Sequence, residues 1–548
     1  MTSQQGTFKS IRYQIGILNI KQKGLSNIYL KKVIAISLKP PTKERAKIIF
    51  LRPNLDTFSM KHKSDTPSLI LSLIPVAALI AMLILNVRLF GDSALDGSVQ
   101  IVLLIATALV SGITLVSKRR TWAQLEKGII NSVAGSTSAI VLLLLIGALA
   151  GSWMLSGVIP AMMYYGLKFI NPEIFLATSC VAAAIVSVSS GSSWTTIATI
   201  GVGLLGVGKA LGFETGWVAG AIISGAYFGD KVSPLSETTN MASSSAGSEL
   251  FSHIRYLMIT TVPSFIITIA IYLIFGLVSD HDTAAQTNEL SIALKETYNL
   301  TPFLFVVPLI TLFLIAKRVP AIIVVFISVL TGSIAAVIFQ PELCGQLNPG
   351  DSTGIGSNIQ GVIRALYGRV APVTGNEMLD ALVTTKGMSG MLNTIWLIIC
   401  AMTFGGVMEA SGMLQKITEK MVTLMRNTFS TVAATTGACL FLNGAAADQY
   451  IAILLPGRMF SEVYRKKGYR PELLSRTLED SATVTSVLIP WNTCGMAQST
   501  VLGVATLTYM PYCFFNLISP VMTIIIAALG YKITKEEPIP AETEVVTE

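Results

Sequence analysis

Long apolar runs, almost free of charge, recur along the chain and constrain its fold more than any other feature. A helix needs about 20 apolar residues to cross the hydrocarbon core of a bilayer. Only 13% of the 548 residues are charged and 52% are hydrophobic, whereas soluble domains average about 25% charged residues. We therefore expect an all-α polytopic membrane protein in a lipid bilayer. The main runs are Leu69–Phe90, Ala321–Phe339 and residues 101–116, 138–155, 256–277, 302–316 and 520–530.

The net charge of +8 arises in the N-terminal tail, residues 1–63. This tail has 13 Lys and Arg residues against 2 acidic ones, which leaves 26 basic and 29 acidic residues in the rest of the chain. The basic character therefore does not indicate a nucleic-acid surface, and no nucleic-acid partner is expected. Two interpretations of the tail stay open. It is a cytoplasmic segment attracted to anionic lipid, or it is translated upstream sequence, with Met60 as the true start.

Basic residues in short loops predict the orientation, because Lys and Arg mark the cytoplasmic side. They lie before the first apolar run and at residues 118–127, 255, 317–318 and 465–470. The acidic segments 91–98 and 280–290 and the long loop 340–389 are then periplasmic. We expect a multi-pass protein of the bacterial inner (plasma) membrane. Both termini, including the tail 532–548, would lie in the cytoplasm.

This orientation requires two segments that enter and leave the membrane on the same side, as re-entrant hairpins. They are residues 173–206 and 428–459, each interrupted midway by Gly and polar residues. Non-helical backbone at membrane depth is tolerated only where protein buries it or where it lines a cavity. We therefore expect the hairpin tips to meet inside the protein. The first tip contains Ser192, Ser193, Trp194, Thr195 and Thr196, and the second contains Asn443, Asp448 and Gln449.

The two halves of the chain also resemble each other. Residues 64–300 and 301–531 would each form a repeat of about five transmembrane helices and one hairpin, and an odd number of crossings inverts the second repeat. Inverted repeats with broken helices at the midplane are the plan of secondary transporters, which bind substrate where the repeats meet. An old duplication without a transport role is the alternative. The matched positions are Gly151 with Gly406, the tip Gly191 with Gly444, and Ser233 with Ser486, at offsets of 255, 253 and 253 residues.

The densest polar sequence in an apolar context is YFGDKVSPLSETTNMASSS, residues 227–245. Gly229 and Pro234 are expected to break the helix and to free carbonyl oxygens. Oxygen-only sites suit hard cations, and a buried carboxylate is costly unless it binds a cation or a proton. One site would therefore hold Na+ when ionised and H+ when protonated; a polar cytoplasmic loop is the alternative. The side-chain donors are Asp230, Ser233, Ser236, Glu237, Thr238, Thr239 and Asn240.

Lys231 is expected to pair with Asp230 or Glu237 and so to lower the cost of their charge. In the second half, residues 478–500 are expected to break at Pro-Trp-Asn-Thr. That segment would add Asp480, near the inner surface, together with Asn492 and Thr493.

Two further carboxylates lie in apolar surroundings. Asp448 is the best single ionisable candidate outside the first polar segment, because apolar residues flank it on both sides. Glu409 is either a buried proton carrier or a residue at a helix end that faces water, and the sequence favours neither.

The motifs argue against an enzyme. The three histidines form no ligand cluster, and the chain has no HExxH, G-x-S-x-G or P-loop motif. No cofactor is expected, since Na+ and H+ would be the transported ions. The six cysteines form no CxxC and are expected to be small apolar filler.

Four segments resemble the signatures of the NhaC-type sodium/proton antiporter family: GDKVSPLSETTNMAS, GSSWTT, ADQYIAILLPG and EDSATVTSVLIPWNT. The resemblance covers about residues 69–531, although family members usually carry Pro where this chain has Val487. It implies secondary active exchange of Na+, or Li+, for H+ by alternating access, in the service of pH and sodium homeostasis. It also implies a mobile domain, carrying both hairpins, that moves against a scaffold.

The same family includes malate/lactate exchangers and amino-acid carriers. A Na+- or H+-coupled carrier of an organic anion or amino acid is therefore the alternative function, with Lys231, Asn240 and Asn492 as anchors for a carboxylate. An intramembrane enzyme or a passive channel is a third alternative. A homodimer is a possible assembly.

Overall fold

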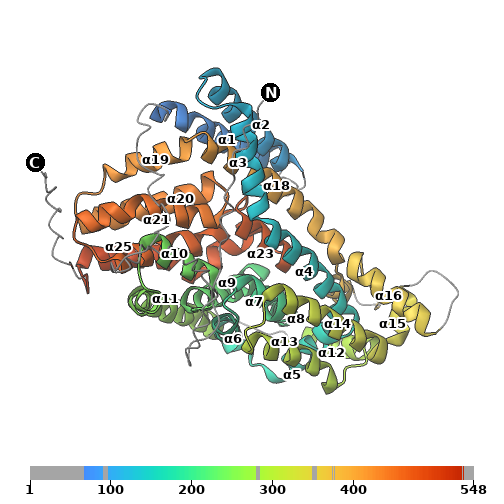
Figure 1. Ribbon diagram of the computed structural model, residues 1–548. Helices are drawn as coiled ribbons and strands as arrows, with labels where there is room; N and C mark the ends of the chain where they lie inside the picture. The colour runs from blue at the N-terminus through green and yellow to red at the C-terminus, as the bar shows by residue number, and fades with distance from the viewer. Residues whose placement is uncertain are drawn as a thin grey trace, which may run out of the picture. The chain divides into compact units, whose positions relative to one another are not determined.

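The computed structural model describes residues 67–90, 97–278, 284–347, 354–372, 374, 377–533 and 535. The expectations for the N-terminal tail and for most of the C-terminal tail lie outside these residues. The described chain is almost entirely helical (Figure 1), and its β-structure is limited to two isolated bridges, Val370–Thr385 and Tyr469–Lys535. The prediction of an all-α protein is confirmed.

The first half of the described chain contains both long apolar helices and short polar ones. Their bounds are α1 Leu69–Phe90, α2 Ser98–Val116, α3 Trp122–Gly135, α4 Thr137–Leu155, α5 Val158–Phe169, α6 Pro172–Ser190, α7 Ser193–Thr196, η3 Ile197–Gly201, α8 Val202–Ala210, α9 Thr215–Val232, α10 Glu237–Ala246, α11 Leu250–Val278 and α12 Ala284–Thr297.

The second half follows a similar pattern. Its bounds are η4 Pro302–Phe305, α13 Val306–Ala316, α14 Ala321–Phe339, α15 Pro341–Gln346, α16 Ile355–Tyr367, α17 Glu377–Val383, η5 Gly387–Met391, α18 Leu392–Ala410, α19 Met413–Val422, α20 Thr428–Ala445, α21 Gln449–Lys466, α22 Pro471–Leu478, η6 Glu479–Thr483, η7 Ser486–Leu488, α23 Thr493–Leu502, α24 Thr506–Tyr509, η8 Met510–Tyr512 and α25 Phe514–Leu529. In its described residues the predicted loop 340–389 thus contains the α-helices α15, α16 and α17 and the start of η5.

Seven helices of the described chain are long and apolar enough to cross a membrane, and nine if each of two bent pairs counts as one span. The bent pairs are Asn288–Thr297 with Pro302–Ala316, at 89°, and Thr506–Tyr512 with Phe514–Leu529, at 56°. Large apolar side chains on these helices are exposed, such as Ile70 on α1 and Ile334 and Ile338 on α14. A surface of this kind suits lipid, and the protein is a multi-pass membrane protein.

The same order of elements occurs in both halves. A long helix (α4, α18) leads through a left-handed glycine (Gly157, φ 82°; Gly412, φ 76°) into a short helix (α5, α19). Two further segments joined by a turn follow, and then a helix that breaks. After the break comes a ten-residue helix (α10, α23) that ends at left-handed Gly247 or Gly503. This order supports an internal repeat, and the inverted orientation of the second copy stays a prediction.

Helices from the two halves pack against each other. Helix α10 lies beside α21 (Figure 1), α3 packs on α18, α4 on α14, and α25 on α11 and α9. The buried apolar residues form three clusters, and Trp194, between α6 and α8, contacts all three. The segment around Trp194 is therefore held where the parts of the molecule converge.

Candidate functional site

The first helix break, residues 233–236, separates α9 from α10 as the sequence predicted. Pro234 cannot donate a backbone hydrogen bond, so the last carbonyls of α9 need other partners. The Thr239 hydroxyl donates to the carbonyl of Lys231 at 3.0 Å. The Asn240 amide donates to the carbonyls of Pro234 at 3.0 Å and Ser236 at 2.7 Å. These two predicted ion ligands therefore serve to stabilise the break.

Asp230, in the last turn of α9, holds the first tip, residues 191–194. Its Oδ2 accepts from the Ser193 backbone N–H at 3.1 Å and from the Ser193 hydroxyl at 2.7 Å. Gly191 has φ +66°, and a Cβ there would lie 2.6 Å from the Cβ of Leu235. The Ser233 hydroxyl also donates to the carbonyl of Val188 at 2.9 Å. Hydrogen bonds thus join the first tip and the helix before it to the residues on either side of the start of the first break.

Nearby hydroxyls complete the first tip. Ser192 caps α7, where its hydroxyl accepts from the backbone N–H of Thr195 at 3.2 Å. The Thr196 hydroxyl donates to the carbonyl of Ser192 at 2.9 Å. Thr195 and Thr196 are both buried, and these bonds fix the shape of the turn.

The second tip, residues 446–449, is held on the second break, residues 489–492. Ala447 has φ 56°, and its carbonyl accepts from the Thr493 N–H at 3.0 Å. The Trp491 indole donates to the carbonyl of Gly444 at 2.8 Å, and the Asn492 amide to that of Asn443 at 3.0 Å. The left-handed turn thus lies at Ala447 and not at the predicted match Gly444, which is part of α20. A left-handed alanine leaves no signal in the sequence.

Polar side chains in and just before the second tip make similar hydrogen bonds. The Asn443 amide donates to the carbonyl of Ala482 at 2.7 Å. Asp448 caps α21, where its Oδ1 accepts from the N–H of Ile451 at 2.9 Å. The Gln449 carbonyl oxygen accepts from the Ser486 hydroxyl at 2.8 Å.

A cavity of about 420 Å³ lies between the two tips and the first break. Asp230 and Asp448, one from each half of the chain, both line it. Nine of the predicted site residues contribute to its wall: Asp230, Ser236, Glu237, Thr238, Asp448, Gln449, Thr493, Ser192 and Trp194. The other wall consists of residues 136–142, at the α3–α4 junction, and residues 318–322, before and at the start of α14. Because Arg318 is exposed, the cavity reaches the surface there.

The other predicted site residues do not line the cavity. Ser193 is bonded to Asp230, and most of the others make the ties described above. They are Ser193, Ser233, Thr239, Asn240, Thr195, Thr196, Asn443, Asp480, Asn492 and Glu409. Glu409 is exposed in the last turn of α18 and lies within electrostatic range of Asp448.

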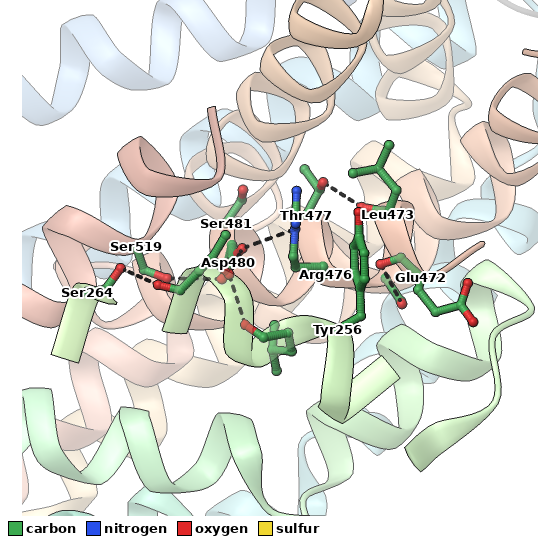
Figure 2. A network of polar contacts seen from close by, with 12 residues as sticks. Tyr256, Ser264, Glu472, Leu473, Arg476, Thr477, Asp480, Ser481 and Ser519 are labelled. Atoms are coloured by element: carbon green, nitrogen blue, oxygen red, sulfur yellow. Dashed lines mark hydrogen bonds and ion pairs between the residues drawn. The ribbon is translucent and has the colours of Figure 1, made fainter. Parts of the chain in front are cut away.

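Lys231 and Asp480 form a buried ion pair between α9 and η6. The predicted pairing of Lys231 with Asp230 or Glu237 is therefore wrong, and Glu237 instead accepts from the Tyr450 hydroxyl at 3.0 Å. Asp480, predicted near the inner surface, is 0% exposed. Figure 2 shows it between Ser519, which donates to it at 3.2 Å, and Arg476, whose Nε lies 4.0 Å from Oδ2.

Sequence reasoning missed Glu479, which precedes Asp480 and is also 0% exposed. The sequence shows only that two adjacent acids follow residues 471–478, and it does not show which of them finds a partner.

The cavity can hold a cation on oxygen atoms. Its donors are the carboxylates of Asp230, Asp448 and Glu237, the hydroxyl of Thr238 or Thr493 and the amide oxygen of Gln449, and hard cations prefer such ligands. Broken helices that meet at a cavity inside a bundle of apolar helices define a membrane transporter.

The similarities of the sequence identify the kind of transporter. Residues 225–531 match the Na+/H+ antiporter family, and the chain belongs to that family. The Na(+)/H(+) antiporter NhaC of Alkalihalophilus pseudofirmus is 35% identical over 76% of this chain and 87% of its own length.

Two other relatives carry different substrates in their names. The arginine/ornithine antiporter ArcD of Halobacterium salinarum is 31% identical over 86% of this chain and 94% of its own. The malate-2H(+)/Na(+)-lactate antiporter of Bacillus subtilis is 31% identical over 82% and 93%.

Proposed function

We propose that this protein exchanges Na+, and also Li+, for H+ across the bacterial inner membrane. The observation that carries the proposal is the cavity that Asp230 and Asp448 line together. The two carboxylates come from α9 and from the turn before α21, so the site spans both halves of the chain.

Competition for a carboxylate supplies the exchange chemistry. An ionised carboxylate binds Na+, whereas the protonated acid has lost the negative charge that attracts it. Each cation therefore displaces the other from the same site. If only loaded forms of the site reorient across the membrane, entry of one cation is coupled to exit of the other.

The orientation predicted from basic loops places Arg318 on the cytoplasmic side. Since Arg318 lines the cavity, the state described here would be open to the cytoplasm. Reorientation would then expose the same carboxylates to the periplasm.

A carrier of an organic anion or amino acid is the second candidate, and Arg318 is the observation that favours it. A guanidinium at the cavity wall can bind a carboxylate through paired hydrogen bonds. Lys231, the cation that the sequence offered for this purpose, is bound to Asp480 and does not line the cavity.

Everted membrane vesicles distinguish the two candidates. After respiration has acidified the lumen, Na+, Li+, K+, malate, lactate and tyrosine are added in turn while a pH-sensitive dye reports dequenching. We expect a response to Na+ and Li+ alone. The Na+ concentration for half response should rise by about tenfold per pH unit on the acid side, because one proton excludes one sodium. A response to malate, lactate or tyrosine and none to Na+ would contradict the proposal.

A further inference from the structure

Glu479 is a buried acid that does not line the cavity. It begins η6, a single π-helical turn of residues Glu479–Thr483, and it is 0% exposed. Within the part of the chain that the structure describes, neither carboxylate oxygen has a hydrogen-bond partner. Single π-turns inside α-helices occur frequently at functional sites. An acid in this position calls for a function or a compensating charge.

The adjacent acid, Asp480, has the partners that Glu479 lacks. Its two oxygens accept from Lys231, from the Thr260 hydroxyl at 2.8 Å and from the Ser519 hydroxyl at 3.2 Å. A buried carboxylate with a cation and two donors is stable in its ionised form. A buried carboxylate without donors is costly as an anion, and a proton removes that cost.

The charged groups within electrostatic range of Glu479 are Asp230 and Lys231 of α9 and Asp480 of its own turn. Among the elements packed against η6, α20 and α25 contain no charged residue. The charged residues of α21 lie beyond its middle, from Arg458 onward.

Helices α22 and α10 are the two remaining neighbours, and the charged side chains Arg476 and Glu237 on them contact groups other than Glu479. On α22, Arg476 is placed over the ring of Tyr256 at 4.7 Å and is paired with Asp480 at 4.0 Å. On α10, the Glu237 carboxylate accepts from Tyr450. Of the three charged groups within electrostatic range of Glu479, Asp230 is the one that lines the cavity.

We propose that Glu479 is an internal proton-binding site, separate from the cavity, which releases its proton when a cation binds at Asp230. With Asp230 ionised and empty, its negative charge opposes ionisation of Glu479. A sodium ion at Asp230 cancels that charge, so Glu479 ionises and its proton leaves to the water of the cavity. The Thr483 hydroxyl, one turn along and also without a partner among the described residues, can then donate to the new carboxylate.

This inference rests on the proposed Na+/H+ exchange and adds one proton to it. Asp448 trades its proton for sodium in the cavity, Asp230 stays ionised with the two Ser193 donors on its Oδ2, and Glu479 contributes a further proton per sodium from outside the cavity. The number of protons exchanged per sodium therefore depends on Glu479.

The test compares the wild type with Glu479→Gln and Glu472→Gln in proteoliposomes. Glutamine keeps the size of the side chain and cannot titrate. Glu472 lies one element earlier, paired with Arg470 at 3.6 Å and away from the cavity, and so it is a matched control. The Na+ gradient that balances an imposed pH gradient gives the number of protons per sodium. We expect Glu479→Gln to give one proton fewer than the wild type and Glu472→Gln to give the same number.

An unchanged ratio in Glu479→Gln would overturn the inference while leaving the proposed function intact. Absence of Na+-driven proton movement in the wild type would instead overturn the proposed function.

A second measurement uses only the wild type, in case Glu479→Gln does not insert. Dicyclohexylcarbodiimide is apolar and reacts with protonated carboxyl groups. Mass spectrometry of the treated protein should locate the adduct on Glu479 and not on Asp480, and Na+ should reduce it. An unmodified Glu479 at acidic pH, with an adduct on Asp480 instead, would overturn the inference.

Discussion

Lys231 and Asp480 are 249 residues apart in sequence and form an ion pair in which neither side chain is exposed. Lys231 lies at the end of α9, next to Asp230, and Asp480 lies in η6, before the second break. The pair therefore joins the two broken segments of the chain directly.

Because Lys231 is bound to Asp480, neutralising it should not compensate for a change at Asp230. We expect Asp230→Asn and Asp448→Asn each to abolish Na+-dependent proton movement in everted vesicles, since an amide neither titrates nor supplies the negative charge that holds Na+. The double variant Asp230→Asn, Lys231→Gln should stay inactive. Recovery of exchange in the double variant would show that Asp230 serves only to balance Lys231.

The ion pair should also determine stability. Removing one partner of a buried pair costs about 3–5 kcal/mol, because the other charge stays buried, whereas apolar replacement of both is often tolerated. We expect Asp480→Leu to lower the unfolding temperature in detergent strongly, and Lys231→Met, Asp480→Leu to recover part of the loss. A double variant no more stable than Asp480→Leu would refute this account.

The two glycines that the sequence matched should differ in their tolerance of alanine. Gly191 is left-handed and close to Leu235, so Gly191→Ala should cost at least about 1–2 kcal/mol and impair transport. Gly444 is helical with open space where a Cβ would lie, so Gly444→Ala should be neutral or slightly stabilising. Thermal unfolding and vesicle transport of both variants test this, and equal losses would contradict it.

Cysteine labelling tests the orientation. Ser389 and Lys466 are exposed, and all six native cysteines are buried, so background reaction should be low. We expect Ser389→Cys to react with an impermeant maleimide in intact spheroplasts and Lys466→Cys only after lysis. The reverse pattern would invert the predicted topology.

The sequence predicts the positions of the helix breaks because the signals are local. Pro234 and Pro490 each interrupt a helical segment, and Gly191 marks the first turn. The helical class and the apolar spans follow from composition and run length in the same way.

The roles of the polar residues are harder to predict. Ser233, Thr239, Asn240 and Asn492 lie in the predicted segments, but their side chains donate to backbone carbonyls of the breaks or of the helices that lead into the tips. Sequence identifies them as oxygen or amide donors and does not show that backbone groups are their nearest partners. The partner of Lys231 and the isolation of Glu479 depend on contacts between distant segments, which one sequence does not reveal.

The hydrogen bonds between the tips and the breaks have a consequence for how the protein changes conformation. Each tip is bonded to its own break, and Lys231–Asp480 joins the two breaks, so these segments should travel as one body. The opposite cavity wall, residues 136–142 and 318–322, comes from other elements. The ion would then bind at the interface between the moving segments and the opposite cavity wall, where these two parts of the protein separate. Opening the pathway to the far side and uncovering the bound ion would be a single event.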